Sequence, residues 1–172
     1  MLEVRYRATT QQAMGIKAKF KGSIDKTFSL FLEEVERQII ESLCRVGEEA
    51  VSYARQDHAN NWQDQTSNLR SSIGYVVFKD GQPISQSTFE QLPPKDATAQ
   101  GAANGGNIGL NLAKQVGAET EGYTLVVVAG MNYAVYVEAK GRDVLAGAER
   151  QAEEHLAREL ADLVKNVKDA FS

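Results

Sequence analysis

The stretch DKTFSLFLEEVERQIIESLCRVGEEAVSYARQD, from Asp25 to Asp57, decides the fold. Apolar side chains recur in it every three or four residues: Phe28, Phe31, Leu32, Val35, Ile39, Leu43, Val46, Ala50 and Ala54. This spacing places them on one face of an α-helix. The stretch therefore predicts a long amphipathic helix over 25–57. Because a rise of 1.5 Å per residue makes it roughly 50 Å long, we expect it to bend near Gly47 or to project at one end.

The same spacing returns near the C-terminus. The apolar stripe there consists of Leu145, Ala148, Ala152, Leu156, Leu160, Leu163, Val167 and Ala170. It predicts a second long helix over 144–171 that also buries only one face.

Three other stretches have the patterns of β-strands. Residues 14–21 alternate apolar side chains with lysines, which predicts a half-exposed edge strand. Residues 71–89 contain many β-formers on both sides of Asp80-Gly81, a strong turn dipeptide, and predict a hairpin. Residues 123–129 are apolar at both odd and even positions, which predicts a strand buried on both faces.

The stretch 90–120 has the least globular composition. It contains Pro93-Pro94 and then the small and polar run AQGAANGGN, which offers no apolar side chain to bury. We expect a mobile loop, or an arm that becomes ordered on assembly. The chain as a whole, 1–172, is expected to form a single α+β domain. Its small antiparallel or mixed β-sheet would pack against two long α-helices, with this long flexible loop attached.

Composition excludes several classes of protein. With 172 residues, 42% hydrophobic and 24% charged, the chain matches an ordinary globular domain. No run of apolar residues is long enough to span a membrane, so no membrane partner is expected. The one cysteine, Cys44, excludes an intramolecular disulfide framework.

Charge is distributed unevenly within a net charge of −4. Residues 1–22 carry a net charge of +4 and residues 25–57 a net charge of −4. Lys17, Lys19 and Lys21 share one face of the predicted strand, so we expect them to steer this segment toward an acidic surface, the long helix 25–57 of a neighbouring copy of the chain. No arginine-rich stripe or aromatic platform accompanies them, and nucleic acid is not an expected partner.

The chain shows no constellation of residues typical of catalysis. We expect no catalytic residue, no metal ligand and no cofactor. The alternative function is a small metal-dependent hydrolase that uses Asp57, His58 and Asp64, because two carboxylates and an imidazole can hold a metal. A bacterial ligand-binding or regulatory module is a third interpretation.

Two short segments resemble a known family when they are taken together. The first is TSNLRSSI, residues 66–73, and the second is NYAVYVEAKG, residues 132–141. They resemble the head–tail joining proteins of long-tailed phages, often labelled minor tail component or tail-completion protein. In that family T-G-x-L-R-x-S-I and Y-A-x-Y-V-E-x-G occur in the same order. Ser67 stands where the family has glycine, and Ala139-Lys140 lengthens the step to Gly141.

The resemblance implies a structural, non-enzymatic phage or prophage protein that assembles as a ring at the head–tail junction. Its partners would be further copies of itself and other phage tail or head-connector proteins. It would be located in the virion, and in the cytoplasm of the bacterial host before assembly. The residues proposed for the motifs or a subunit interface are Asn68, Leu69, Arg70, Ile73, Tyr133, Tyr136, Val137 and Glu138. Among these, Glu138 could pair with Arg70 or with a neighbouring subunit.

Overall fold

The computed structural model describes residues 23–56, 66–94 and 104–170. The chain forms two compact units, Met1–Arg37 and Gln38–Ser172. The described part of the first unit is the beginning of helix α1, where Phe28, Leu30 and Leu32 are each about half exposed. The predicted strand 14–21 lies outside the described residues.

The long apolar stripe forms α1, Ser23–Arg55, which is one uninterrupted helix. Gly47 lies within this helix, and the packing of α1 against the sheet explains why this residue is glycine. A Cβ at this position would come within 2.6 Å of the ring of Tyr75, so glycine lets the helix lie close to the sheet. The second stripe forms α5, Ala146–Ala170.

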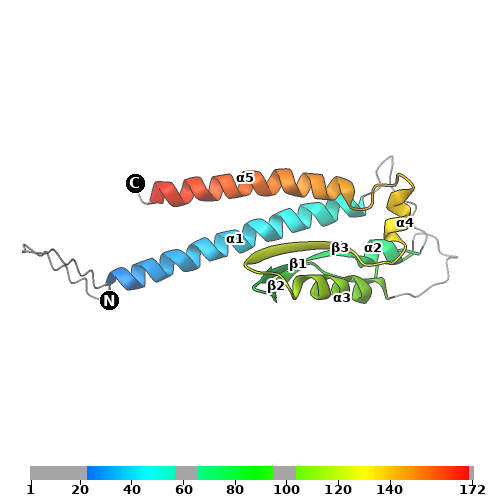
Figure 1. Cartoon of the computed structure of the whole chain (residues 1–172), viewed down its shortest axis with the longest axis horizontal. Helices are drawn as coiled ribbons and strands as arrows, with labels where there is room; N and C mark the ends of the chain where they lie inside the picture. The colour runs from blue at the N-terminus through cyan, green and yellow to red at the C-terminus, as the bar shows by residue number, and fades with distance from the viewer. Residues whose placement is uncertain (1–22, 57–65, 95–103, 171–172) are drawn as a thin grey trace, which may run out of the picture. The chain divides into compact units, whose positions relative to one another are not determined.

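In the part of the chain that the structure describes, three antiparallel strands form a sheet: β1 (Ile73–Lys79), β2 (Gln82–Gln86) and β3 (Tyr123–Ala129). Their order is β2-β1-β3, so β1 is central. The turn between β1 and β2 has positive φ at both Asp80 (49°) and Gly81 (75°), which the tightest hairpin turns require. The protein is therefore an α+β fold with an antiparallel sheet and two long helices, as expected (Figure 1).

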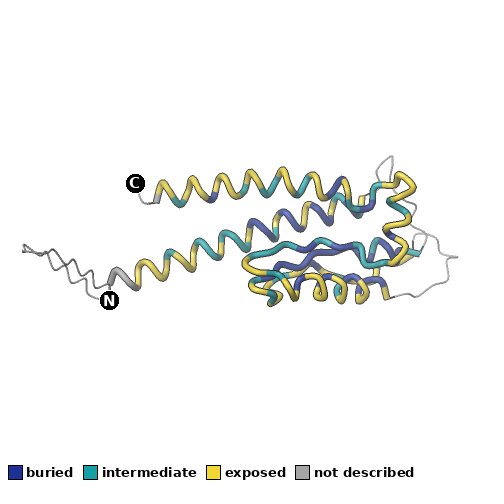
Figure 2. The backbone as a smooth tube through the Cα atoms, viewed as in Figure 1, coloured by how far each residue is buried: buried dark blue, intermediate teal, exposed yellow. Residues whose placement is uncertain are grey.

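Helices cover both faces of the sheet, and each face has its own core. On one face Ile73, Tyr75 and Val77 pack with α1 and α5, whereas on the other Val76 and Phe78 pack against α3. Figure 2 shows the buried stretch along the sheet in dark blue. Alternating side chains of β1 thus enter two different cores.

The prediction of full burial for residues 123–129 is wrong. β3 is an edge strand, and five of its seven residues are only half-buried. Apolar residues at odd-numbered positions of β3 contact one core and those at even-numbered positions contact the other, which explains the sequence pattern. The open side of the strand, which no sequence pattern reveals, leaves it partly exposed.

The prediction of a mobile loop over 90–120 is also wrong for residues 105–117. Residues 105–117 form α3, Gly105–Gly117, while 95–103 lie outside the described residues. Small residues repeat every fourth position along one face of α3: Gly105, Gly109, Ala113 and Gly117. All four are buried, so the helix is held by close approach of its backbone to its neighbours and needs no large side chains on this face.

The described residues also form two short helices, α2 (Asn68–Ser72) before β1 and α4 (Ala134–Ala139) after β3. Among the described residues, no helix has both the length and the apolar character needed to cross a membrane.

Candidate interaction site

The first motif begins with a strained residue, Ser67. Its φ of 59° lies in the left-handed region, which favours glycine, and its side chain is almost completely buried. Ser67 Oγ donates a hydrogen bond to Pro93 O at 2.6 Å, and Ser71 Oγ donates one to Ser67 O at 2.5 Å. Glycine adopts this backbone most readily, and the two hydrogen bonds hold serine in it here.

Three of the proposed interface residues in this motif are buried within the chain. Leu69 and Ile73 lie in the hydrophobic core on the side of the sheet that α1 covers. Asn68 Oδ1 accepts a hydrogen bond from Gln91 Nε2 at 3.4 Å, and Gln91 Oε1 accepts one from the backbone N–H of Gly105 at 3.0 Å. These residues hold α2 to its surroundings and are not available to a partner.

Arg55, at the end of α1, reaches the same motif. Its Nη2 donates to Ile73 O at 2.6 Å and to Thr88 O at 3.3 Å. Burial lowers the pKa of Arg55 from its ordinary value, and the positive charge of Arg70 acts in the same direction. Arg70 itself is half-buried.

Ser72 joins the first motif to the two residues that directly precede the second. Its backbone oxygen accepts a hydrogen bond from Gly130 N–H at 3.1 Å, and its Oγ accepts one from Met131 N–H at 3.3 Å. The first motif therefore lies beside the start of the second, where β1 begins and β3 ends.

The second motif presents an exposed apolar surface on α4. Tyr133, Val135 and Tyr136 are 38%, 77% and 63% exposed, and we call these three residues the α4 surface. Ala134, by contrast, is buried and anchors the helix in the core. Lys140 Nζ lies 4.3 Å from the centre of the Tyr136 ring, a cation–π contact. Large apolar side chains held in the open on a short anchored helix are typical of an interaction site.

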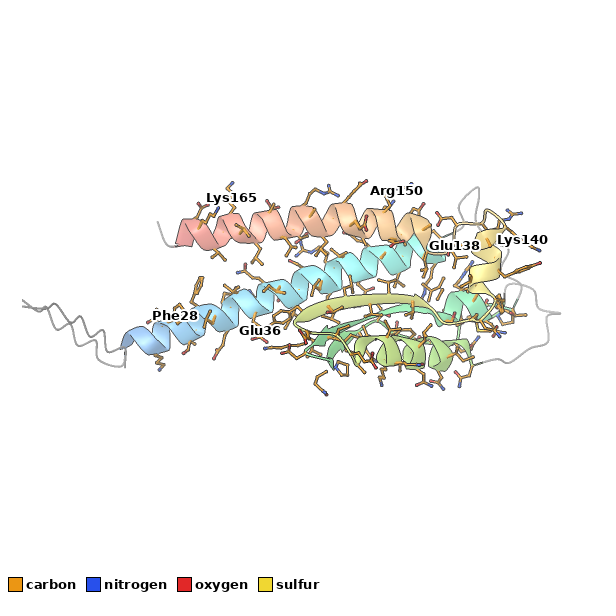
Figure 3. The ribbon with its side chains drawn as sticks, in the orientation of Figure 1. Phe28, Glu36, Glu138, Lys140, Arg150 and Lys165 are labelled. Carbon is orange, nitrogen blue, oxygen red and sulfur yellow. The ribbon has the colours of Figure 1, made fainter. Side chains whose placement is uncertain are left out.

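Glu138 fixes the far end of α4. Its Oε1 accepts hydrogen bonds from the backbone N–H groups of Ala146 at 2.9 Å and Leu145 at 3.3 Å, at the start of α5 (Figure 3). The first turn of a helix has unsatisfied N–H groups that attract a carboxylate, which explains these contacts. Pairing of Glu138 with Arg70 or with a neighbouring subunit stays a prediction. Val137 is half-buried against the core, so Tyr133 and Tyr136 are the proposed residues that lie exposed.

Sequence reasoning missed two exposed apolar features. Val135 was not singled out, although it is the most exposed residue of the α4 surface. A second row lies on the outer side of α3, where Ile108, Leu112 and Val116 are spaced four residues apart and are all exposed. The spacing would have revealed this row if 105–117 had been recognised as a helix.

No group of three or more metal-binding side chains lies within 23–56, 66–94 or 104–170. Asp57, His58 and Asp64 lie outside these ranges, as do Lys17, Lys19 and Lys21. The other histidine, His155, pairs with Glu49 between α5 and α1. Cys44 is half-buried, and its Sγ lies 3.2 Å from Ser85 Oγ.

Comparison with known proteins identifies no relative of this chain. No family model, no curated protein and no solved structure matches this chain. The functional conclusion therefore depends on the residues and their geometry.

Proposed function

We propose that this chain is a non-enzymatic structural protein of a phage or prophage, a tail-completion or minor tail component that assembles as a ring at the head–tail junction. It acts in the virion, and before assembly it is present in the cytoplasm of the bacterial host. Its partners are further copies of itself and neighbouring tail or head-connector proteins.

The observation that carries this proposal is the contact of the first family-like motif, at Ser72, with the residues that directly precede the second. The hydrogen bonds from Gly130 and Met131 place the start of the second motif beside the first, although the two are far apart in sequence. The positive φ at Ser67 supports the resemblance, because the family's glycine occupies the same step of its motif.

Exposed apolar surface supports an assembly role. The α4 surface and the row on α3 each expose three large apolar side chains. Exposed apolar patches are commonly sites that a binding partner covers. A ring needs head-to-tail contacts between unlike surfaces, and the two patches lie on different helices.

The first experiment measures assembly of the full chain by size-exclusion chromatography with light scattering and by negative-stain electron microscopy. We expect closed rings. Val135→Ser should weaken them because Val135 is 77% exposed on α4. Val164→Ser is the matched control, since Val164 is also exposed, on α5. If both variants weaken assembly equally, the α4 surface is not part of the interface. If the wild-type protein stays monomeric at all concentrations, the ring proposal is contradicted.

The second experiment tests the virion role and the hydrolase alternative. Deletion of the gene from the phage or prophage that carries it should leave heads and tails unjoined, and expression from a plasmid should restore infectious particles. Normal virions without the gene would overturn the proposal. Stoichiometric metal binding in calorimetry that is lost in His58→Ala or Asp64→Ala would instead favour the hydrolase.

A further inference from the structure

The outer edge of β3 is open within the part of the chain that the structure describes. Two hydrogen bonds, from Asp80 N–H to Gly122 O and from Gly130 N–H to Ser72 O, set the register of β3 with β1. Because backbone groups alternate in direction along an antiparallel strand, every second residue of β3 faces away from β1. The residues with outward N–H and C=O groups are Tyr123, Leu125, Val127 and Ala129. Such an edge is a template for another strand.

A cavity of about 550 Å³ lies beside β3. Its wall is mostly apolar and comes from three elements. The lining residues are Leu43, Val46 and Ala50 of α1, Tyr123, Thr124, Leu125 and Val127 of β3, and Leu145, Ala148, Glu149, Ala152, Glu153 and Leu156 of α5 or its start. Protein interiors contain few voids larger than a water molecule, so a hollow of this size is suited to receive side chains from another segment.

We infer that residues 14–21 of a second copy of this chain bind at this edge as an added β-strand, with Ile16, Ala18 and Phe20 entering the cavity. This mode of binding gains backbone hydrogen bonds from the strand edge and specificity from the pockets for alternate side chains. The segment lies outside the described residues, and its strand character follows from its sequence.

The alternation of the segment matches the two sides of the site. A strand beside β3 has one face over the apolar cavity, and its other face is in solvent. Residues 14–21 are apolar at every second position, and Gly15, Lys17, Lys19 and Lys21 occupy the other positions. A second copy of β3 fits less well, because it is apolar at both parities and would place apolar side chains in solvent.

Charge complements the pattern. Glu149 and Glu153 lie exposed on the α5 side of the cavity, and Glu119 and Glu121 lie exposed just before β3. Residues 1–22, which contain the proposed strand, carry a net charge of +4. Opposite charges around the two surfaces speed encounter and disfavour other partners.

The choice of a second copy as occupant rests on the proposed ring. A donated strand and an accepting edge are unlike surfaces, so their contact is head-to-tail and can close into a ring. The same contact also predicts how defective copies behave. A copy that cannot donate its strand can still accept one, and a copy with a filled cavity can still donate.

The test uses two full-length variants. Ile16→Asp with Phe20→Asp disables the donated strand, and Ala152→Phe fills the cavity from α5. Each should reduce the association constant at least about 30-fold, the effect of losing an interface anchor. An equimolar mixture should form a dimer and nothing larger, because one working donor then meets one working acceptor. Light scattering measures the masses, and circular dichroism verifies that each variant is folded.

Matched controls keep the result specific. Thr9→Asp with Thr10→Asp adds the same charge outside residues 14–21, and Ala157→Phe adds the same ring at an exposed position of α5 away from the cavity lining. Both controls should assemble as the wild type does. If the donor or the cavity variant assembles normally while Val135→Ser does not, the inference is overturned and the ring proposal stands.

Hydrogen exchange gives an independent measurement on the unmodified protein. The amides of Leu125 and Val127 should become protected as protein concentration rises, since the incoming strand bonds them. Protection that is independent of concentration in a monomer, and is lost in the donor variant, would mean that the segment binds its own chain and would overturn the second copy as occupant. Absence of protection at every concentration would overturn the strand addition itself.

Discussion

Replacing Gly109 of α3 by alanine tests the close packing that the structure assigns to this helix. A Cβ at this position would lie 2.2 Å from the backbone oxygen of Ser72 and 3.1 Å from a ring carbon of Phe89. A carbon–oxygen contact is normally no shorter than about 3.3 Å, so α3 and α2 must separate by about 1 Å. The obstacle is backbone, so no side-chain rotation can relieve it.

The magnitude follows from three effects. Overpacking costs about 1–3 kcal/mol, and the separation weakens the Gly130–Ser72 hydrogen bond, a further ~1 kcal/mol. Alanine returns about 1 kcal/mol through its higher helix propensity. We therefore expect Gly109→Ala to lower the free energy of unfolding by about 2 kcal/mol, which corresponds to a fall of about 4–8 °C in Tm.

The assay is urea unfolding followed by far-UV circular dichroism, with thermal unfolding as a second measurement. Asn111→Ala is the matched control, because Asn111 is exposed on the same helix and its replacement should stabilise by about 0.5 kcal/mol through propensity alone. If Gly109→Ala is stabilised as much as Asn111→Ala, α3 does not pack closely on α2 and the reasoning fails.

Two further predictions concern buried groups. Ser67→Ala and Ser67→Gly both lose the hydrogen bond to Pro93, but only glycine relieves the strain of the positive φ. Ser67→Ala should therefore destabilise the protein by about 1 kcal/mol more than Ser67→Gly, and equal Tm values for the two variants would contradict this. Burial, followed by the nearby Cys44 and Glu48, raises the pKa of Tyr75 above its ordinary value, so the native state retains the phenol proton that the unfolded chain loses near pH 10. Stability should therefore fall as pH rises above about 10, and Tyr75→Phe should flatten this decline in alkaline urea titrations; an unchanged slope would show that other groups cause it.

Several parts of the fold follow from local patterns in the sequence. The stripe from Phe28 to Ala54 defines α1 because helix periodicity is a property of the chain itself. The turn at Asp80-Gly81 is also local, since its two residues tolerate positive φ. The α+β class follows from these elements together.

The candidate site was only partly predictable. The second motif pointed to Tyr133 and Tyr136, which are exposed, whereas Asn68, Leu69 and Ile73 proved to be buried. Exposure depends on which neighbours cover a residue, and the sequence around α2 does not specify these. Val135 looks like a core residue in the sequence and becomes surface because α4 buries only Ala134.

Only the tertiary structure shows why the glycines of α3 lie in a helix and where β3 lies in the sheet. Residues 105–117 contain four glycines, a composition typical of a loop, and they form a helix here because α2 and the sheet lie close enough to contact its backbone. β3 has the pattern of a central strand, yet the order β2-β1-β3 places it at the edge. The sequence by itself determined the periodicity of each element, because periodicity reflects local backbone geometry. The partners of each face and edge were decided by contacts between distant segments, which no local pattern encodes.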